Sequence, residues 1–359
     1  MKIAVISFDF DRIGGIERVA LDIVHSLKRR EEVETLSLKD YQKSEGWRLF
    51  RAIYNRVSAP GKVKNRLDEM KPDIVIVMHP FILKYIGEKR SYRVVCWTHG
   101  IDVFGKNGKK VEKLLKTRCD RIVAVSRFTK ERIVEDLDID ASLVDVVNNC
   151  VDTTDFIYSR TDDSLPFRIL TVGRLEKSES YKGHEVVMES MRILIDRGMD
   201  ILYDIAGDGD GRDSLKSLSR ELGIEDRVRF HGAVDSEELK RLYRKSHLFV
   251  MPSCYEIKMD GSATGEGFGI VYIEAGATGR AVIGCDTGGQ TDYIKDGKNG
   301  FLCRPVPEEI AKRIETLYRD RDLLKRMGDR GREDVESGFS PEIFEKNLSR
   351  VVECAVYSE

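Results

Sequence analysis

The chain has 359 residues, of which 41% are apolar and 34% are charged, and its formal net charge is −2. This length favours two domains, and the sequence contains no run of about 18 apolar residues of the kind that spans a membrane. Seven scattered cysteines with no C-x-x-C spacing argue against a disulfide framework or a zinc site. The N-terminus enters a strand without a signal-peptide pattern, so we expect a cytoplasmic protein.

The first part of the chain alternates short β-rich runs with helical patterns. The runs are KIAVISF, DIVIVMH, RVVCWTHG and RIVAVS, and a second series follows with FRILTVG, DILYDIAGDG, VRFHGAV, HLFVMPS and AVIGCD. Nearly continuous apolar strands between amphipathic helices are typical of parallel sheets that are covered on both faces. Two such series predict an α/β protein with two Rossmann-like, doubly wound domains.

The polar stretch 151–166 separates the two series. We therefore expect an N-terminal domain over residues 1–152 and a C-terminal domain over residues 153–340. A last helix, from about residue 341 to residue 359, is expected to pack back on the first domain. Residues 1–152 carry a net charge of +6 and residues 153–359 one of −8, which makes an anionic partner for the first domain plausible.

Candidate ligand-binding residues follow the predicted strands. In doubly wound sheets, ligands bind beyond the carboxyl ends of the strands. The residues at these positions are Gly14 and Gly15, His79, His99, Arg174, Gly207 to Gly209, Glu266, and Gly288 with Gly289. We expect each domain to present a ligand-binding edge.

The segment EGFGIVYIEAGATG contains two glutamates, Glu266 and Glu274, eight residues apart. A helix that begins near Phe268 would direct backbone N–H groups at a phosphate above Gly267 and Gly269. Glu274, about two turns further along, could accept hydrogen bonds from sugar hydroxyls. The same spacing occurs on solvated helices, but a helix buried on most sides carries a carboxylate only with a partner. The segment therefore predicts a phosphate-and-ribose site.

Together, EGFGIVYIEA, VGRL with a following KG, THGID and NNCVD resemble the family-4 retaining glycosyltransferases of the GT-B fold, also called group 1 glycosyltransferases. The motifs occur in the family's order through essentially the whole chain. The resemblance implies a nucleotide-sugar donor bound mostly by the second domain, with no metal and no other cofactor. The segment DFDRIGGIE lacks the G-x-G-x-x-G pattern, so a nicotinamide cofactor is a poor fit.

The resemblance assigns roles to individual residues. His99 would contact the transferred sugar, Glu266 its 3- and 4-hydroxyls, and Glu274 the ribose. The other implied donor-binding residues are Gly14, Gly15, Gly207, Gly209, Val234, Gly267, Phe268, Gly269 and Ile270. Asp102, His79 and Ser126 are candidates for the acceptor side, and Asp102 could instead orient His99. A plain turn is the alternative for Gly14 and Gly15.

Arg174 and Lys182 match the family's cation pair for the leaving diphosphate. The segment between them, LEKSESY, is longer than the usual spacing, so Lys177 competes with Lys182 for this role. Lys182 is preferred because Lys182 and Gly183 precede a predicted helix, as in the family. Asp208 and Asp210 form a D-x-D pattern, but they fall on the glycine turn that the family uses near the nucleoside, so no metal is expected.

The donor and the acceptor are less constrained. The long loop CYEIKMDGSATG resembles the lipid mannosyltransferase branch, which favours GDP-mannose, with UDP-linked hexoses or N-acetylhexosamines as the alternative. The acceptor is expected to be a glycan or a lipid-linked glycan. Residues 39–66 carry a local charge of +6, with Trp47, Phe50, Tyr54 and Val57 at helical spacing. This pattern predicts peripheral contact with an anionic membrane on its inner face, or a core-facing stripe beside a solvated cationic face.

Three other functions fit the sequence less well. A catalytically silent nucleotide-sugar-binding protein would be free to lose the candidate residues that this chain retains. An epimerase would form product without an acceptor, and a phosphorylase normally needs a pyridoxal-lysine site that the sequence does not show. Nucleic acid is not an expected partner because the basic segments carry no recognised binding motif. The sequence thus predicts a retaining, metal-independent hexosyltransferase.

Overall fold

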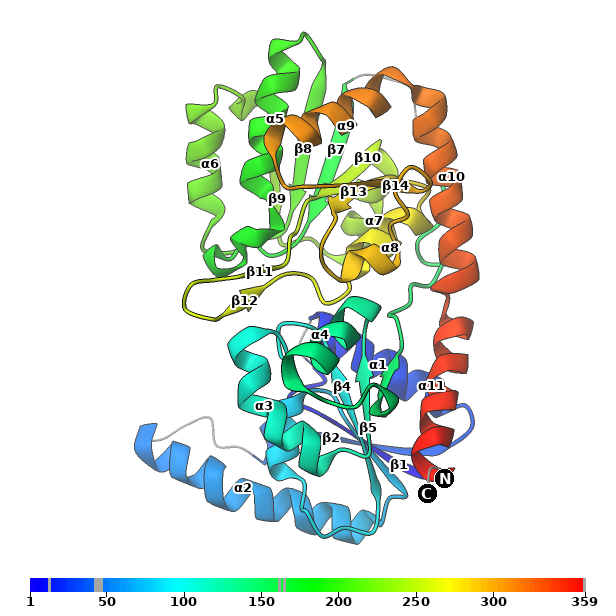
Figure 1. The fold of residues 1–359 in the computed structure, drawn as a ribbon. Coiled ribbons are helices and arrows are strands. Elements are labelled where there is room, and N and C mark those ends of the chain that lie inside the picture. The colour runs from blue at the N-terminus through cyan, green and yellow to red at the C-terminus, as the bar shows by residue number, and fades with distance from the viewer. Residues whose placement is uncertain (12–13, 42–47, 161–162, 164–165, 358–359) are drawn as a thin grey trace. The chain divides into compact units, whose positions relative to one another are not determined.

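A computed structural model of the chain describes residues 1–11, 14–41, 48–160, 163 and 166–357, with backbone alone for residues 48–58 (Figure 1). The chain divides into two compact units. Unit 1 contains residues 1–149, 259–263 and 341–359, and unit 2 contains residues 150–258 and 264–340. The division falls within three residues of the predicted boundary at residue 152. Part of the predicted linker, residues 161–162 and 164–165, lies outside the described residues.

Unit 1 is built on a six-stranded sheet in the order β2-β1-β3-β4-β5-β6, and its strand pairings are parallel. The strands are β1 (Lys2–Ser7), β2 (Glu32–Ser37), β3 (Ile74–Val77), β4 (Arg93–Thr98), β5 (Arg121–Ala124) and β6 (Val144–Val146). The helices are α1 (Gly15–Leu27), α2 (Arg48–Met70), α3 (Gly105–Arg118), α4 (Arg127–Leu137) and α11 (Pro341–Tyr357).

Unit 2 holds a second six-stranded sheet, in the order β14-β13-β10-β7-β8-β9, again with parallel pairing. The strands are β7 (Phe167–Val172), β8 (Ile201–Ala206), β9 (Val228–Gly232), β10 (Leu248–Met251), β13 (Ala281–Cys285) and β14 (Gly300–Cys303). The helices are α5 (His184–Asp196), α6 (Arg212–Glu221), α7 (Ser236–Lys245), α8 (Ile270–Ala277), α9 (Pro307–Arg319) and α10 (Arg321–Gly338).

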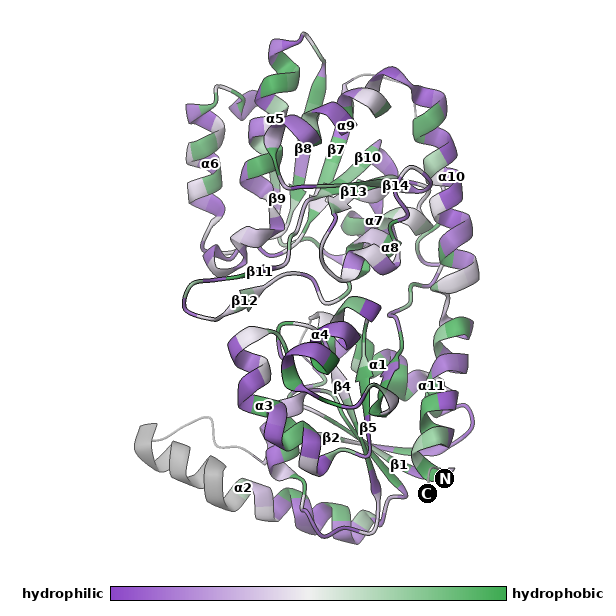
Figure 2. Ribbon diagram, in the orientation of Figure 1, coloured by the Kyte–Doolittle hydropathy of each residue, from purple (hydrophilic) through white to green (hydrophobic). Residues whose placement is uncertain are grey.

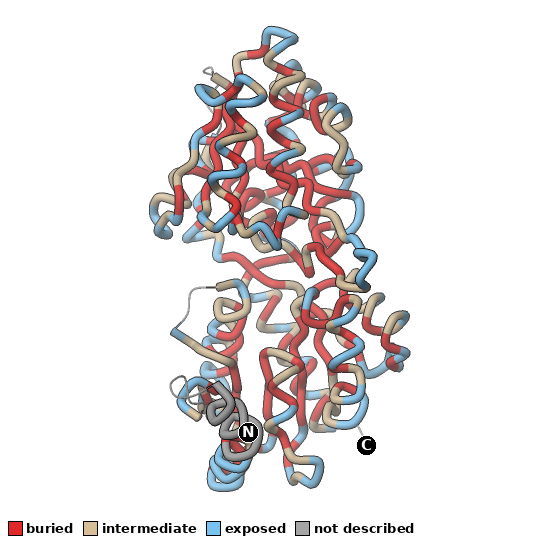
Figure 3. Tube along the Cα trace, turned by 90° about the vertical axis from the view of Figure 1, so that its left-hand side faces the viewer, coloured by how far each residue is buried: buried red, intermediate tan, exposed pale blue. Residues whose placement is uncertain are grey.

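Strands β3 (IVIV) and β10 (LFVM) are apolar along their whole length, as the green ribbon of β10 shows in Figure 2, and Figure 3 shows buried segments in the middle of each unit. All four residues of β3 and of β10 are buried. In unit 2 the core lies between the sheet and helices α5 and α9, which pack against each other. Burial on both faces explains why these strands read as continuous apolar runs rather than alternating ones. The predicted pair of parallel α/β domains is confirmed.

The strands that the sequence did not reveal are short or partly exposed. β2 reads EVETLS, of which only Leu36 is buried, and β6 has three residues. β14 has four residues and follows a turn. The long loop after β10 contains a two-stranded sheet of β11 (Glu256–Ile257) and β12 (Ala263–Thr264). These elements depend on tertiary pairing more than on a local apolar pattern.

Helix α11 packs within unit 1, beside α1, as Figure 1 shows. The ring of Phe344 lies 6.3 Å from that of Trp97, and Arg29 pairs with Glu345 at 3.0 Å. An apolar stripe of this helix, which includes Leu348 and Val352, is buried. The C-terminal helix therefore completes the first unit, at the place where the sequence predicted it.

Helix α2 contains residues 48–66 of the predicted membrane-contacting segment. Its described apolar residues, Ala59, Val63, Leu67 and Met70, are all buried. The predicted stripe of Trp47, Phe50, Tyr54 and Val57 lies outside the described side chains, so membrane contact and its core-facing alternative both stay predictions. In the described part of the chain, no helix is long and apolar enough to cross a membrane.

Candidate functional site

The loop after β7 carries Arg174, and the loop after β8 holds it in place. The Gly173 N–H donates to the Ala206 carbonyl at 3.0 Å, and the Leu175 N–H donates to the Asp208 carbonyl at 2.9 Å. These bonds extend the pairing of the two strands beyond their carboxyl ends. The backbone of Arg174 is thereby fixed at the edge of the sheet where ligands of doubly wound folds bind.

The glycines of the GDGDG turn are required by this packing of loop on loop. A Cβ on Gly207, whose φ is +144°, would lie 1.8 Å from the Gly173 carbonyl oxygen. A Cβ on Gly209 would lie 2.4 Å from the Leu175 carbonyl carbon. The family resemblance implies that these two glycines give room to a nucleoside. The structure shows a closer reason, since the backbone of the neighbouring loop occupies the space that a side chain needs.

Asp208 and Asp210, the D-x-D pattern, are both used within the same turn. Asp208 accepts from the Gly209 N–H at 2.9 Å and from Arg212 at 3.3 Å. Asp210 accepts from the backbone N–H of Lys177 at 2.7 Å. In the part of the chain that the structure describes, no group of three or more His, Cys, Asp or Glu side chains is arranged to hold a metal ion. The two aspartates are thus turn-forming residues in this structure.

Arg174, Glu179, Lys182 and Glu266 form a continuous cluster of alternating charge in unit 2. Lys182 Nζ lies 2.8 Å from Glu266 Oε1 and 3.7 Å from Glu179 Oε2. Glu179 also pairs with Arg174. The Lys182 and Glu266 side chains are 11% and 15% exposed, whereas Arg174 is 68% exposed. Two predicted cations and one predicted carboxylate are therefore brought together, and Glu179 is an addition that the sequence analysis did not identify.

Lys177 and Lys182, which compete for the same predicted role, differ in their surroundings. Lys177 is exposed, and its backbone N–H donates to Asp210. Lys182 ends the short 3-10 helix Lys177–Lys182, and Gly183 follows it with a φ of +78°. Gly183 is also the N-cap of α5. This left-handed turn directs the chain into the helix while the Lys182 side chain reaches Glu266.

Glu266 is held by three segments of unit 2. Its carbonyl oxygen accepts from the Gly289 N–H at 2.8 Å, and its carboxylate accepts from the Ser253 hydroxyl at 3.4 Å as well as from Lys182. Nearby, the buried side-chain amide of Gln290 donates to the carbonyls of Ser253 and Cys285 at 3.0 and 2.8 Å. Gln290 was not predicted, because nothing in the sequence indicates that it joins these loops.

Helix α8 begins at Ile270 rather than near Phe268. Gly269 is its N-cap, with a φ of +86°, and the turn in this left-handed conformation delays the helix by two residues. The Phe268 side chain is buried with its ring 5.8 Å from that of Phe339. Phe268 therefore packs in the core, and it could meet a donor through its backbone. Ile270 opens the helix and is partly exposed.

Glu274 is the fifth residue of α8, so it lies little more than one turn from the helix start instead of two. The residue is buried, with 2% of its surface exposed, and the Tyr243 hydroxyl donates to its Oε2 atom at 2.9 Å. The prediction that a carboxylate on this buried helix has a partner is confirmed. Tyr243 lies on α7, 31 residues away in the chain, and no sequence motif connects the two. Val234 is partly exposed and precedes α7.

In unit 1, Gly14 is the N-cap of α1 and Gly15 is its first residue, as predicted. Arg12 and Ile13 lie outside the described residues. Ser126 caps α4, where its hydroxyl accepts from the Thr129 N–H at 3.0 Å. His79 caps the 3-10 helix Pro80–Tyr85 by accepting from the Phe81 N–H at 3.1 Å. Ser126 and His79 thus have structural roles that do not depend on an acceptor.

His99 follows β4 and is held by its neighbours. Its Nε2 atom lies 2.9 Å from the Met78 carbonyl oxygen, which can only accept, so Nε2 carries the proton. The two carboxylate oxygens of Asp102 accept from the His99 backbone N–H at 2.9 and 3.0 Å. Asp102 therefore orients the backbone of His99 rather than its ring.

Burial governs the titration of this pair. Burial, together with neighbouring His79, lowers the pKa of His99 to about 3, against the hydrogen bond to Met78, which raises it. Burial raises the pKa of Asp102 to about 7, against the backbone N–H groups that favour its ionised form. The His99 ring is consequently neutral at pH 7, and its Nδ1 atom carries a lone pair.

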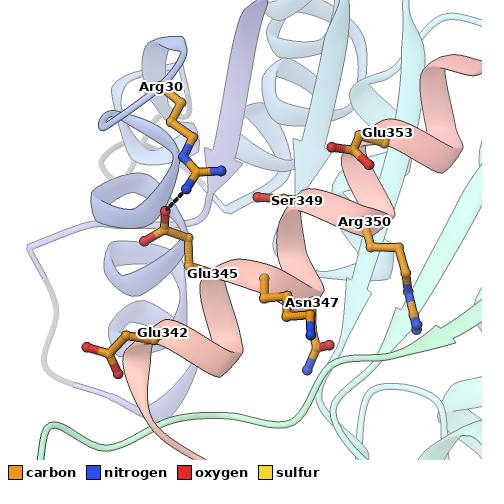
Figure 4. Close-up of a pocket in the computed structure, with 8 residues that line it drawn as sticks. Arg30, Glu342, Glu345, Asn347, Ser349, Arg350 and Glu353 are labelled. Carbon is orange, nitrogen blue, oxygen red and sulfur yellow. Dashed lines mark ion pairs between the residues drawn. The ribbon is translucent and has the colours of Figure 1, made fainter.

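A separate surface hollow of about 620 Å³ lies in unit 1, along α11 (Figure 4). Arg30 reaches over it from beyond the end of α1 and pairs with Glu345 at 3.4 Å. The other lining residues come from α11 and are all polar or charged, and none of the predicted site residues is among them.

Comparison with known proteins finds two glycosyltransferase family models, which match successive parts of the chain. The family described as "Glycosyl transferases group 1" matches residues 159–334, and "Glycosyltransferase Family 4" matches residues 13–155. The uncharacterized glycosyltransferase MJ1607 of Methanocaldococcus jannaschii is 29% identical over 66% of this chain and 60% of its own length. The lipopolysaccharide core biosynthesis glycosyltransferase LpsE of Rhizobium meliloti is 26% identical over 94% of this chain and 95% of its own length.

Among solved structures, Anabaena Alr3699/HepE, in complex with UDP and glucose, has a TM-score of 0.80. It is 18% identical in sequence, over 98% of this chain and 99% of that chain, so the likeness concerns the fold. Its fold agrees with the two parallel-sheet units described above, and the family matches agree with the ordered motifs. The chain belongs to the group 1 glycosyltransferases of the GT-B fold, and it is a glycosyltransferase.

Proposed function

We propose that this glycosyltransferase transfers a hexose from a nucleoside diphosphate sugar to a glycan or lipid-linked acceptor, with retention of configuration and without a metal ion. The observation that carries the proposal is the 2.8 Å contact between Lys182 Nζ and Glu266 Oε1. It joins the cation assigned to the leaving diphosphate with the carboxylate assigned to the transferred sugar. Arg174 contributes a second cation to the same cluster through Glu179.

Two cations suit the chemistry of the leaving group. As the bond between the anomeric carbon and the phosphate oxygen breaks, negative charge grows on the diphosphate. A guanidinium and an ammonium in a partly buried site stabilise that charge more than they stabilise the bound donor. The acceptor oxygen then bonds to the anomeric carbon on the face that the phosphate leaves, and the leaving phosphate takes the acceptor proton. Retention follows from attack on that face.

His99 has the protonation state that contact with a sugar requires. With Nε2–H donated to Met78, its Nδ1 atom can accept a hydrogen bond from a sugar hydroxyl. Because the pKa of His99 is about 3, the ring stays a neutral acceptor over the ordinary pH range. Asp102 contributes by fixing the turn from which the imidazole projects.

The donor is proposed to be GDP-mannose, from the resemblance of the loop after β10 to the lipid mannosyltransferase branch. That loop is ordered into the β11–β12 sheet. A UDP-linked hexose is the second candidate, and the Anabaena structure in complex with UDP and glucose favours it. Both donors contain a ribose joined to a diphosphate, so the proposed roles of Lys182 and Glu274 are the same for the two.

Release of nucleoside diphosphate from a panel of donors tests the proposal. GDP-mannose, UDP-glucose, UDP-N-acetylglucosamine and ADP-glucose are each incubated with the enzyme in excess chelator, with and without candidate glycan acceptors. The expected result is release of one nucleoside diphosphate with one donor, which Glu266→Gln reduces strongly. Binding of a donor without release by the wild type, under every acceptor condition, would favour the catalytically silent alternative.

A further inference from the structure

Glu179 lies in the segment between Arg174 and Lys182 that is longer than the family's usual spacing. Its N–H donates to the Glu176 carbonyl at 2.8 Å, and its backbone, at φ −109° and ψ 24°, departs from the helical conformation of its neighbours. This bend occurs in the middle of the short 3-10 helix. The longer segment thus places a carboxylate between the two cations of the site.

The Glu179 carboxylate is buried, and its two oxygens differ in their contacts. Its side chain is 9% exposed, one oxygen pairs with Arg174, and the other, Oε2, has no hydrogen-bond partner among the described residues. That second oxygen is 3.7 Å from Lys182 Nζ, which is an ion pair beyond hydrogen-bond length. Burying a carboxylate in this way is costly unless nearby cations offset the loss of hydration. Arg174 and Lys182 therefore hold Glu179 in place by charge.

The same two cations are proposed to bind the donor's diphosphate. Lys182 Nζ lies closer to Glu266, at 2.8 Å, than to Glu179, at 3.7 Å. Arg174 is 68% exposed, so its guanidinium can change partner without rearranging the core. A diphosphate oxygen and the Glu179 carboxylate would then compete for Arg174, because each is an anion that can form an ion pair with the same guanidinium.

We propose that Glu179 is an internal anion that occupies Arg174 when the site is empty and competes with the diphosphate when the site is filled. This inference rests on the proposed function and adds a residue to it. Competition weakens the binding of the nucleoside diphosphate product, and it therefore speeds product release. Glu179 is a positioning residue, since it acts on the ligand through Arg174.

The test is calorimetric titration of UDP, GDP and ADP into the wild type and Glu179→Gln, in chelator. Glutamine keeps the size of the side chain and removes its charge. We expect Glu179→Gln to bind the preferred nucleoside diphosphate about three- to tenfold more tightly. Glu176→Gln is the matched control, because it removes the same charge from the same segment, and its carboxylate forms no ion pair in the described part of the chain. Its Kd should change less than twofold.

A second pair of variants identifies the cation through which Glu179 acts. In the Arg174→Ala background, Glu179→Gln should raise the affinity for the nucleoside diphosphate less than twofold, because the guanidinium for which the two anions compete is gone. Glu179→Ala serves as a second substitution should glutamine disturb the loop, and it should shift Kd in the same direction. A melting temperature close to that of the wild type establishes that each variant is folded.

The outcomes separate the two proposals. If the wild type binds a nucleoside diphosphate, and folded Glu179→Gln binds it equally or less tightly, the competing-anion role is wrong and the proposed function stands. If both Glu179 variants fail to fold, the carboxylate is a structural element and the inference is also wrong. If neither the wild type nor Glu179→Gln binds UDP, GDP or ADP, the proposed function fails, and the inference fails with it.

Discussion

Lys182 and Glu266 are 84 residues apart in the chain, yet Lys182 Nζ donates to Glu266 Oε1 at 2.8 Å in a partly buried ion pair. Lys182 comes from the turn before α5, and Glu266 comes from the loop before α8. The pair joins the two loops on which the proposed chemistry depends. A cation that is already paired and oriented requires little reorganisation when charge develops on a leaving group.

The first prediction concerns Lys182→Met, which keeps the length of the side chain and removes its positive charge. Turnover should fall by about two orders of magnitude, because a cation on the leaving group acts most in the transition state. Initial rates of nucleoside diphosphate release measure the loss. Lys177→Met is the matched control, since Lys177 is an exposed lysine of the same segment. Equal losses in the two variants would contradict the assignment of Lys182.

The second prediction separates the ribose contact from the diphosphate contact. Glu274→Gln should weaken nucleoside diphosphate binding by about 1 kcal/mol or somewhat more for each lost hydrogen bond to the ribose. Binding of inorganic pyrophosphate, which has no ribose, should be unchanged. Calorimetric titration measures both ligands. An equal loss for pyrophosphate would show that Glu274 acts on the phosphates or on the fold.

The third prediction concerns Gly207. A Cβ at this position would lie 1.8 Å from the Gly173 carbonyl oxygen, at a φ of +144°. Gly207→Ala should therefore lower the free energy of unfolding by about 2–4 kcal/mol. Gly198→Ala is the control, because Gly198 also has a positive φ but has no atom within 4 Å of an added Cβ. Gly198→Ala should lower the free energy of unfolding by about 1 kcal/mol.

Denaturant unfolding distinguishes the two explanations of this glycine. If Gly207 served only to give a nucleoside room, Gly207→Ala would unfold at the same denaturant concentration as the wild type. It would then show its defect in nucleotide affinity alone.

The parts of the fold and the site that depend on neighbouring residues in the sequence could be predicted. Long apolar runs such as those of β3 and β10 predicted buried parallel strands, and the glycines around Glu266 predicted a ligand-binding loop. Arg174, Lys182 and Glu266 came from a family resemblance, and the structure brings them into one cluster. These features could be predicted because each depends on residues that lie within one short segment of the sequence.

The contacts between distant segments were not predictable. Tyr243 donates to Glu274 from another helix, and Gln290 joins the loops of Ser253 and Cys285. Glu179 belongs to a segment whose extra length is evident, but the bend that places its carboxylate between two cations is a property of the folded backbone. The helix start at Ile270 was likewise misjudged, because Gly269 adopts a left-handed conformation that the sequence permits but does not require.

The fourth prediction is a pH dependence. The pKa of His99 is lowered from 6.5 to about 3 in the folded protein, mainly by burial. Between these values the unfolded chain binds a proton that the folded protein excludes, so the stabilisation present above pH 6.5 is lost as the pH falls. From pH 7 to pH 5 the wild type should lose about 1–2 kcal/mol more unfolding free energy than His99→Gln. Parallel stability curves for the two proteins would contradict the lowered pKa.

Calorimetric titration of the wild type with UDP, GDP and ADP, in excess chelator, shows whether unit 2 binds a nucleoside diphosphate through protein cations. One of the three should bind without any divalent ion, and the Arg174→Ala/Lys182→Met double variant should lose at least about tenfold in affinity. Binding that appears only when a divalent cation is added, or binding that the double variant retains in full, would show that these cations do not hold the diphosphate.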